Sequence, residues 1–269
     1  MCCFSGESRW WRYRSVEKVS ATNIFVRAAS DGNQMLVYSM QLRSKIDLAM
    51  ILPLPVPAAT SEHAVRFVSL KSYPQFFSDL RRGFPDLYEP TRAKPATPPF
   101  GIQTRPTLPV HEVGDLEASY VPSAQDWDRL DARFRIPPRL FDAVPAYRRF
   151  GFAVFKLKAT GLRTWRSLLP SRAPTKTIHP MAFEFPRADP EHLFFPTVHV
   201  HDGRFHPTAD FDHTLYCQGP NRRLSDWRQS DDVAEQFMDI RKAEGLIEPQ
   251  EVCFKLDLQG KMKNEDVIV

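Results

Sequence analysis

Histidines crowd into one stretch of the 269-residue chain, where five of the eight fall within residues 192–213. His199 and His201 precede an Asp202-Gly203 pair, and His206 follows it. Asp-Gly is a pair that two-residue hairpin turns favour. With that turn His199 would lie opposite His206, and residues that are opposed or two apart share one face of a hairpin. The pattern therefore predicts three imidazoles on one face.

Imidazoles held on one rigid face supply half of a coordination shell for Zn, Fe, Ni or Cu. We predict a transition-metal site with His199, His201 and His206 as ligands, completed by His213 or a nearby carboxylate. Asp202, in the turn itself, is the candidate catalytic carboxylate. An open coordination position predicts a metal-dependent hydrolase or oxidoreductase, whereas a closed one would only staple the hairpin. The alternative is a solvated edge hairpin that binds no metal.

The amino terminus offers a different chemistry. Initiator methionine is normally removed before a small residue such as Cys2, which would then carry both a thiol and a free α-amine. Enzymes with an amino-terminal nucleophile use this pair as nucleophile and base. Over Met1-Cys2 the chain resembles cysteine-type amino-terminal nucleophile hydrolases, but Cys3 stands where those families often have glycine or threonine. The resemblance implies an αββα sandwich and an alternative function, that of a cysteine amidohydrolase with Cys2 as nucleophile.

A third interpretation is a binding module without catalysis. Residues 9–14 interleave arginine with tryptophan and tyrosine, side chains that can stack on bases, hold phosphates or dock the terminus on the protein body. The formal net charge of +4 falls short of the basic field of a dedicated nucleic-acid binder. We therefore expect a small-molecule or peptide substrate rather than nucleic acid.

Composition also bears on the cellular compartment. The longest apolar run, residues 48–60, is interrupted by three prolines and is far shorter than the ~20 residues of a membrane-spanning helix. The first residues lack the apolar stretch of a signal peptide. Four cysteines, two of them adjacent, make a poor disulfide framework for this length. The expected location is the cytoplasm, with no membrane partner.

Alternating apolar and polar residues predict β-structure in the first third of the chain. Strands at 24–29 and 34–42 flank an Asp31-Gly32 hairpin turn. A third strand at 47–54 contains prolines, which predict a sheet edge or an end to the pairing. After a fourth strand at 65–70, a short helix begins at Pro74 and ends at Gly83 in the left-handed conformation. Its predicted buried face comprises Phe76, Phe77 and Leu80.

The second half of the chain also contains predicted helices and strands. Ser123 is expected to cap a helix that runs to about Arg135. Strands follow at 149–158 and 180–185. A late helix is predicted over residues 231–244, with Ser230 as its cap, Phe237 in its buried stripe and Gly245 as its stop. Apolar and polar residues alternate from Val252 onward and predict a final strand.

Hairpins separated by helices indicate an α+β fold, formed by a largely antiparallel β-sheet with a few short helices. Residues 17–269 are expected to form a single domain. A proline-rich surface connection interrupts it at about residues 90–109. Residues 1–16 are expected to be a flexible or docked amino-terminal segment.

Overall fold

The structure is a computed structural model that describes most of the chain. The described residues are 2–6, 16–29, 31–44, 47–85, 111–113, 116–130, 141–142, 144–158, 175–200, 204–219 and 224–269. The proline-rich connection predicted at 90–109 and the arginine and tryptophan residues of segment 9–14 lie outside this part.

The larger of two sheets contains strands from both halves of the sequence. Its order is β14-β15-β13-β2-β3-β10-β5, with β9 pairing β3, and only β13 and β2 are parallel neighbours. The strands are β14 (Arg228–Val233), β15 (Val252–Lys263), β13 (Thr208–Gln218), β2 (Val16–Ala28), β3 (Asn33–Ser44), β10 (Met181–Pro186), β5 (Arg66–Ser69) and β9 (Lys176–Thr177).

The smaller sheet has the order β12-β1-β4-β8-β7-β6, in which only β12 and β1 are parallel neighbours. Its strands are β12 (His199–Val200), β1 (Cys2–Gly6), β4 (Leu48–Leu54), β8 (Gly151–Leu157), β7 (Leu116–Val121) and β6 (His111–Val113). A separate antiparallel pair joins β11 (Phe194–Phe195) to β16 (Val267–Ile268).

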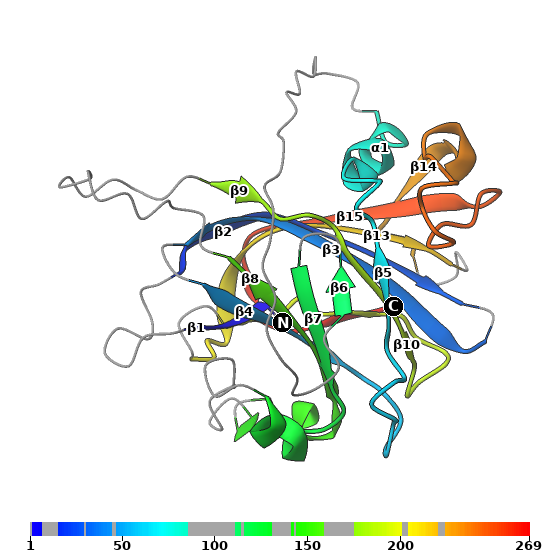
Figure 1. Cartoon of the computed structure of the whole chain (residues 1–269). Coiled ribbons are helices and arrows are strands. Elements are labelled where there is room, and N and C mark those ends of the chain that lie inside the picture. Colours follow the sequence, from blue (N-terminus) through cyan, green and yellow to red (C-terminus); the bar gives the residue numbers. More distant parts are fainter. Residues whose placement is uncertain are drawn as a thin grey trace, which may run out of the picture.

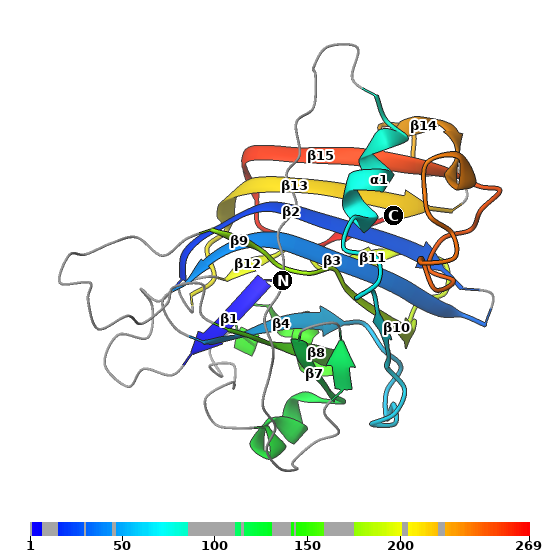
Figure 2. The same cartoon turned by 45° about the horizontal axis from the view of Figure 1, so that its top comes forward.

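The two sheets pack face to face, as Figures 1 and 2 show from two directions. Inward residues of both sheets meet in one apolar core, for example Leu36 and Leu215 of the larger sheet and Met50 and Phe155 of the smaller. The fold is therefore mainly β, with mixed but largely antiparallel sheets. The expected hairpins and scarcity of helices are confirmed, whereas mainly β is a better description than α+β.

Short helices cover the outer faces of the sandwich. Outside the larger sheet lie α1 (Phe76–Arg82) and the loops around η5 (Ala234–Gln236). Outside the smaller sheet lie η1 (Ala124–Arg129) and η3 (Pro145–Arg149). In the described part of the chain, no helix has the length and apolar character needed to span a lipid bilayer.

The late helix predicted over 231–244 is wrong. Ser230 lies inside strand β14, where its hydroxyl donates to the Asp232 carbonyl and accepts the backbone N–H of Cys253. These partners come from β14 itself and from the neighbouring β15, so sheet pairing replaces the predicted helix cap. Phe237 is nonetheless buried, in the apolar cluster outside the larger sheet.

Helix α1 is confirmed with its three predicted buried side chains, but Gly83 ends it in a right-handed conformation, with φ of −68°. The need for glycine there is steric. A Cβ atom at position 83 would lie 2.6 Å from Cζ of Phe237, closer than carbon atoms can approach. The tip of the aromatic ring of Phe237 therefore occupies the space above the Gly83 backbone.

The predicted turn at Gly32 is present in the structure, whereas the predicted edge position of strand β4 is not. The hairpin at Gly32 is confirmed, with φ of +86° and an N–H that donates to the Ala29 carbonyl. Strand β4 is not the predicted edge, because β1 and β8 flank it. Yet β1 pairs with β4 only as far as Ile51, and Pro53 pairs with β8 alone. The proline does mark where pairing on one side ends.

The helix expected after Ser123 is present as the 3₁₀ turn η1, which begins as predicted. The Ser123 hydroxyl oxygen accepts the backbone N–H of Gln125 at 3.2 Å. η1 ends at Arg129, because Leu130 is extended, with φ of −85° and ψ of 148°. The single helix predicted to run to about Arg135 is therefore wrong, and residues 131–135 lie outside the described part.

Candidate functional site

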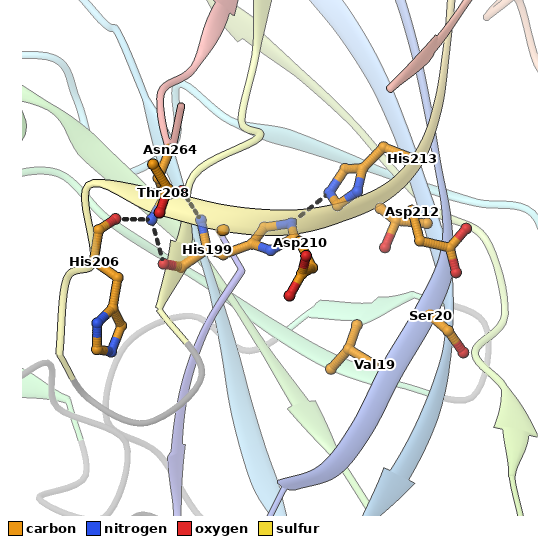
Figure 3. A pocket seen from close by; sticks show the side chains of 11 residues that line it. Val19, Ser20, His199, His206, Thr208, Asp210, Asp212, His213 and Asn264 are labelled. Carbon is orange, nitrogen blue, oxygen red and sulfur yellow. Dashed lines mark hydrogen bonds between the residues drawn. The ribbon is translucent and has the colours of Figure 1, made fainter. Parts of the chain in front are cut away.

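Two of the predicted histidines meet at the edge of the sandwich. His199 comes from β12 of the smaller sheet and His213 from β13 of the larger. Their Nε2 atoms are 3.0 Å apart, and Figure 3 shows the two rings directed toward one another. The ring centroids are 4.6 Å apart and the planes differ by 29°. An N–H···N hydrogen bond requires one ring to donate and the other to accept, so the pair shares a single proton along this axis.

The predicted hairpin register is corrected. His199 does not pair with His206 among the described residues, because β12 pairs with β1 and β13 begins only at Thr208. The ring of His206 is directed away from the His199–His213 pair (Figure 3). His201 and Asp202 lie outside the described residues.

Asn264 fixes the backbone of His199. Its side-chain Oδ1 accepts the His199 N–H at 2.7 Å, and its Nδ2 donates to the His199 carbonyl at 2.9 Å. The same Nδ2 donates to the His206 carbonyl at 2.8 Å. Asn264 is itself buried, with 3% of its surface exposed. A single amide therefore provides what a neighbouring strand would provide, and it ties the two histidine segments together.

The residues before His199 are held in the same way by the chain around Asp266. Oδ1 of Asp266 accepts the backbone N–H groups of Thr197 and Val198, at 2.9 and 3.0 Å. Its Oδ2 accepts the Tyr147 hydroxyl. A carboxylate that accepts three hydrogen bonds gives β12 a defined position at the edge of the sheet.

His213 is positioned by β13, which lies between β15 and β2 in the larger sheet. Along β13, Phe211 and His213 are buried, while Asp210 and Asp212 are exposed. This alternation follows from the two-residue period of a strand. Phe211 stacks on His199, with centroids 4.6 Å apart, and contacts His213 at 5.3 Å. The imidazole pair is thus packed against an aromatic wall.

A pocket of about 380 Å³ opens beside the pair. Most of its lining side chains are polar, and those labelled in Figure 3 show how they surround the opening. They include Ser20, Thr22, His199, His206, Thr208, Asp210, Asp212, His213 and Asn264. A pocket of this size and lining suits a small polar ligand.

The pocket wall contains a distorted segment of β2. Ala21 has φ of +49°, which is uncommon for a residue with a side chain, and the β2–β3 register shifts between Ser20 and Asn23. The Asp212 carboxylate accepts the Ala21 N–H at 2.9 Å and so stabilises this bulge. Bulges of this kind often lie next to binding sites because they redirect the strand.

The described residues do not contain a complete metal site. Among them, no group of three or more His, Cys, Asp or Glu side chains is arranged to hold a metal ion. His213, which the sequence offered as a fourth ligand, is a partner of His199. Asp210 and Asp212 line the same pocket as His213, but they alternate with Phe211 and His213 along β13 and are exposed.

The backbone of Cys2 lies beside His199. In the parallel pairing of β1 with β12, Cys2 is the register partner of His199 and Cys3 that of Val200. Two candidates that the sequence offered as separate hypotheses, the amino-terminal cysteine and the histidine cluster, are therefore neighbours in one sheet. Asn264 and Asp266, which position His199, had no sequence signal, because isolated polar residues after a strand usually belong to a solvated loop.

No protein-family model and no curated protein sequence matches the chain. Solved structures of baculovirus P35 align over nearly all of it. The crystal structure of P35 matches with a TM-score of 0.47 and 11% identity, covering 94% of this chain and 96% of P35. A mutated P35 after caspase cleavage matches at a TM-score of 0.41 and 11% identity, covering 93% and 99%. The caspase-8/P35 complex gives a TM-score of 0.41 at 11% identity, covering 93% and 95%.

Proposed function

We propose that the protein binds a transition-metal ion between His199 and His213 and acts on a small polar substrate in the adjoining pocket. The observation that supports this proposal is the approach of the two Nε2 atoms to 3.0 Å at the pocket wall. It retains the metal-dependent hydrolase or oxidoreductase expected from the sequence, with His199 and His213 of the predicted ligand set at its centre.

The separation of the two nitrogens suits a shared ion. Zinc binds imidazole nitrogen at about 2.0–2.1 Å, so two ligands on adjacent positions of one ion are roughly 3.0–3.4 Å apart. Binding an ion in place of the shared proton would keep the two nitrogens near their present separation and would turn each ring so that its lone pair points to the ion. Both imidazoles would then be neutral and carry their remaining proton on Nδ1.

The rigid backbone positions of His199 and His213 also favour a metal site. His213 comes from a strand paired on both sides, and the backbone of His199 is held by Asn264 at both its N–H and its carbonyl. Ligands held on rigid elements lose little conformational entropy on binding. An ion held there would face the pocket, where it could polarise a carbonyl or lower the pKa of a bound water. A small-molecule or peptide substrate would enter from the open side.

Elemental analysis of protein purified without a histidine tag tests this proposal. We expect close to one transition-metal ion per chain, and loss of most of it in His199→Ala and in His213→Ala. His192→Ala is the matched control, because His192 contacts Asp189 at 2.7 Å and lines a different pocket. Wild-type protein that holds no metal after careful repletion would refute the metal site.

A cysteine amidohydrolase is a second candidate, and one observation favours it. This observation is the backbone register, in which Cys2 is the partner of His199, a residue whose imidazole could serve as a base. Intact mass bears on this function, since retained Met1 would exclude an amino-terminal nucleophile. The binding module based on residues 9–14 stays a prediction, to be tested by alanine replacement of Trp10, Trp11, Arg12 and Arg14.

A further inference from the structure

Strand β13 has a paired strand on both sides for only part of its length. It pairs with β15 from Thr208 onward, but its parallel pairing with β2 begins at His213, opposite Thr22. In an antiparallel ladder, successive residues direct their N–H and C=O groups alternately to the two sides of the strand. In the described part of the chain, residues 208–212 therefore present backbone donors and acceptors on a side that no strand covers.

The bulge in β2 creates this opening. The β2–β3 register shifts just after Ser20, and Ala21 has φ of +49°. The residues of β2 before the bulge continue to pair with β3, although the pairing with β13 has ended. The pocket of about 380 Å³ lies between the separated strands, because it is lined by Val19 and Ser20 of β2 and by residues of β13 from Thr208 to His213.

Apart from its histidines, this pocket has acidic titratable groups. Asp210 and Asp212 are exposed, and the described lining residues include no lysine or arginine. Figure 3 shows Asp210 on the side of β13 that faces Val19, in the opening between the two strands. Lys261 is the register partner of Asp210 on β15, yet no ion pair joins these two described side chains. The lining therefore favours a ligand with a positive charge.

We propose that the substrate of the pocket is a short extended peptide that contains a lysine or arginine and pairs with residues 208–212 of β13. This inference rests on the proposed function for what happens to the peptide once it is bound. Added strands of this kind take their affinity from main-chain hydrogen bonds and their specificity from side-chain pockets. The cationic side chain would be bound by the carboxylates of Asp210 and Asp212.

The position of this peptide connects it to the histidine pair. The open segment of β13 ends at His213, and His199 lines the same pocket. A peptide that pairs along residues 208–212 would therefore lie directly beside the two imidazoles. Of the two substrate classes expected from the sequence, small molecule and peptide, this geometry favours the peptide.

Fluorescence anisotropy with a labelled peptide tests the charge. The probe is fluorescein-labelled Thr-Val-Arg-Val-Thr with an amidated carboxyl terminus, titrated with tag-free protein at low ionic strength. A chelator is present, so that binding is measured without a metal. The same peptide with citrulline in place of arginine keeps the shape and loses the charge. We expect the arginine peptide to bind at least about tenfold more tightly.

Two substitutions test the carboxylates. Asp210→Asn and Asp212→Asn should each weaken binding of the arginine peptide by about threefold to tenfold and leave the citrulline peptide unchanged. Asparagine at position 212 keeps an oxygen that can accept the Ala21 N–H, so the bulge is preserved. Asp232→Asn is the matched control, because Asp232 is an exposed carboxylate on the edge strand β14, and both peptides should bind it as they bind the wild type.

Amide hydrogen exchange of the wild-type protein tests the strand pairing without any variant. The arginine peptide should slow exchange at alternate amides within residues 208–212, those that do not bond to β15, and leave the amides of β14 unchanged. Methylated peptides give a second check. Methylation of alternate backbone nitrogens should abolish binding in one of the two possible patterns and spare it in the other, because only one set of N–H groups would face β13.

The outcomes separate this inference from the proposed function. Equal affinity for the arginine and citrulline peptides, or unchanged exchange at residues 208–212, would overturn the peptide site, and elemental analysis would still decide the metal site. If the arginine peptide binds through Asp210 and Asp212 but the protein holds no metal after repletion, the peptide site stands and the metal-dependent function is wrong.

Discussion

The side chain of Asn264 makes hydrogen bonds to both the N–H and the carbonyl of His199, at 2.7 and 2.9 Å. This amide holds the backbone of one imidazole of the candidate site, while the other imidazole, that of His213, lies on a central strand of the larger sheet. The geometry of the candidate site therefore depends on a residue outside the imidazole pair.

Asn264→Asp tests this dependence with almost no change in size. A carboxylate can still accept the His199 N–H, but it cannot donate to the carbonyls of His199 and His206. Leaving these acceptors without their donor should lower the free energy of unfolding by about 1–3 kcal/mol. We also expect weaker metal binding, measured by titration, because His199 is no longer fixed. Denaturation and titration curves that both match the wild type would show that Asn264 does not position His199.

The contact between Gly83 and Phe237 predicts a strongly non-additive pair of substitutions. Phe237→Ala should lower the free energy of unfolding by about 3 kcal/mol, because it empties a buried aromatic site. Gly83→Ala should also destabilise, because its Cβ would lie 2.6 Å from the ring. In the double variant the collision is absent, so the combined cost should be clearly below the sum. Urea denaturation of the four proteins checks this, and simple additivity would contradict the contact.

Buried thiols predict a fall in stability in alkaline solution. Burial raises the pKa of Cys253 from 9.0 to about 12, and it raises the pKa of Cys217 as well. Above pH 9 the unfolded chain loses these thiol protons while the folded chain keeps them. The free energy of unfolding should therefore decrease between pH 9 and about 12, by at most about 1.4 kcal/mol per pH unit for each thiol.

Cys253→Ala separates this effect from other alkaline transitions. We expect a shallower decline for this variant than for the wild type over the same pH range, measured by chemical denaturation. Identical slopes would mean that the thiol ionises equally in both states and that Cys253 is accessible to solvent in the folded protein.

Metal removal gives a prediction about thermal stability. An ion that binds only the folded chain stabilises it by about 2.7 kcal/mol at a concentration one hundred times its dissociation constant. Chelation should therefore lower the melting temperature of the wild type, and zinc should restore it. His213→Ala should not respond to either treatment, whereas His192→Ala should respond as the wild type does. A zinc effect that persists in His213→Ala would place the binding site elsewhere.

Much of the fold could be predicted because strands and tight turns leave local patterns. The strands that became β3, β4, β8, β10 and β15 follow from alternation, and the turn at Gly32 follows from the need for a positive φ. The failure at Ser230 has the same origin, because helix caps are also local signals. There the hydroxyl bonds with the neighbouring strand, and such tertiary partners leave no mark in the nearby sequence.

The candidate site was only partly predictable for a related reason. The sequence identified the region with the histidines, but it assigned their neighbours through a local turn. In the structure the ring of His199 contacts the ring of His213 in the other sheet, and the backbone of His199 pairs with that of Cys2 on the adjacent strand. Both relationships depend on sheet order. Sheet order arises from packing the whole core, so no short segment encodes it.

The pairing of β1 with β12 has a consequence for how the protein folds. It joins Cys2 to His199, positions that are separated by most of the chain, and closing such a long loop is entropically costly. Folding slows as contacts become more distant in sequence. The register between Cys2 and His199 should therefore form in one of the last steps of folding, after the hairpins have assembled. In a refolding experiment, metal uptake would then follow the slowest kinetic phase rather than the early collapse.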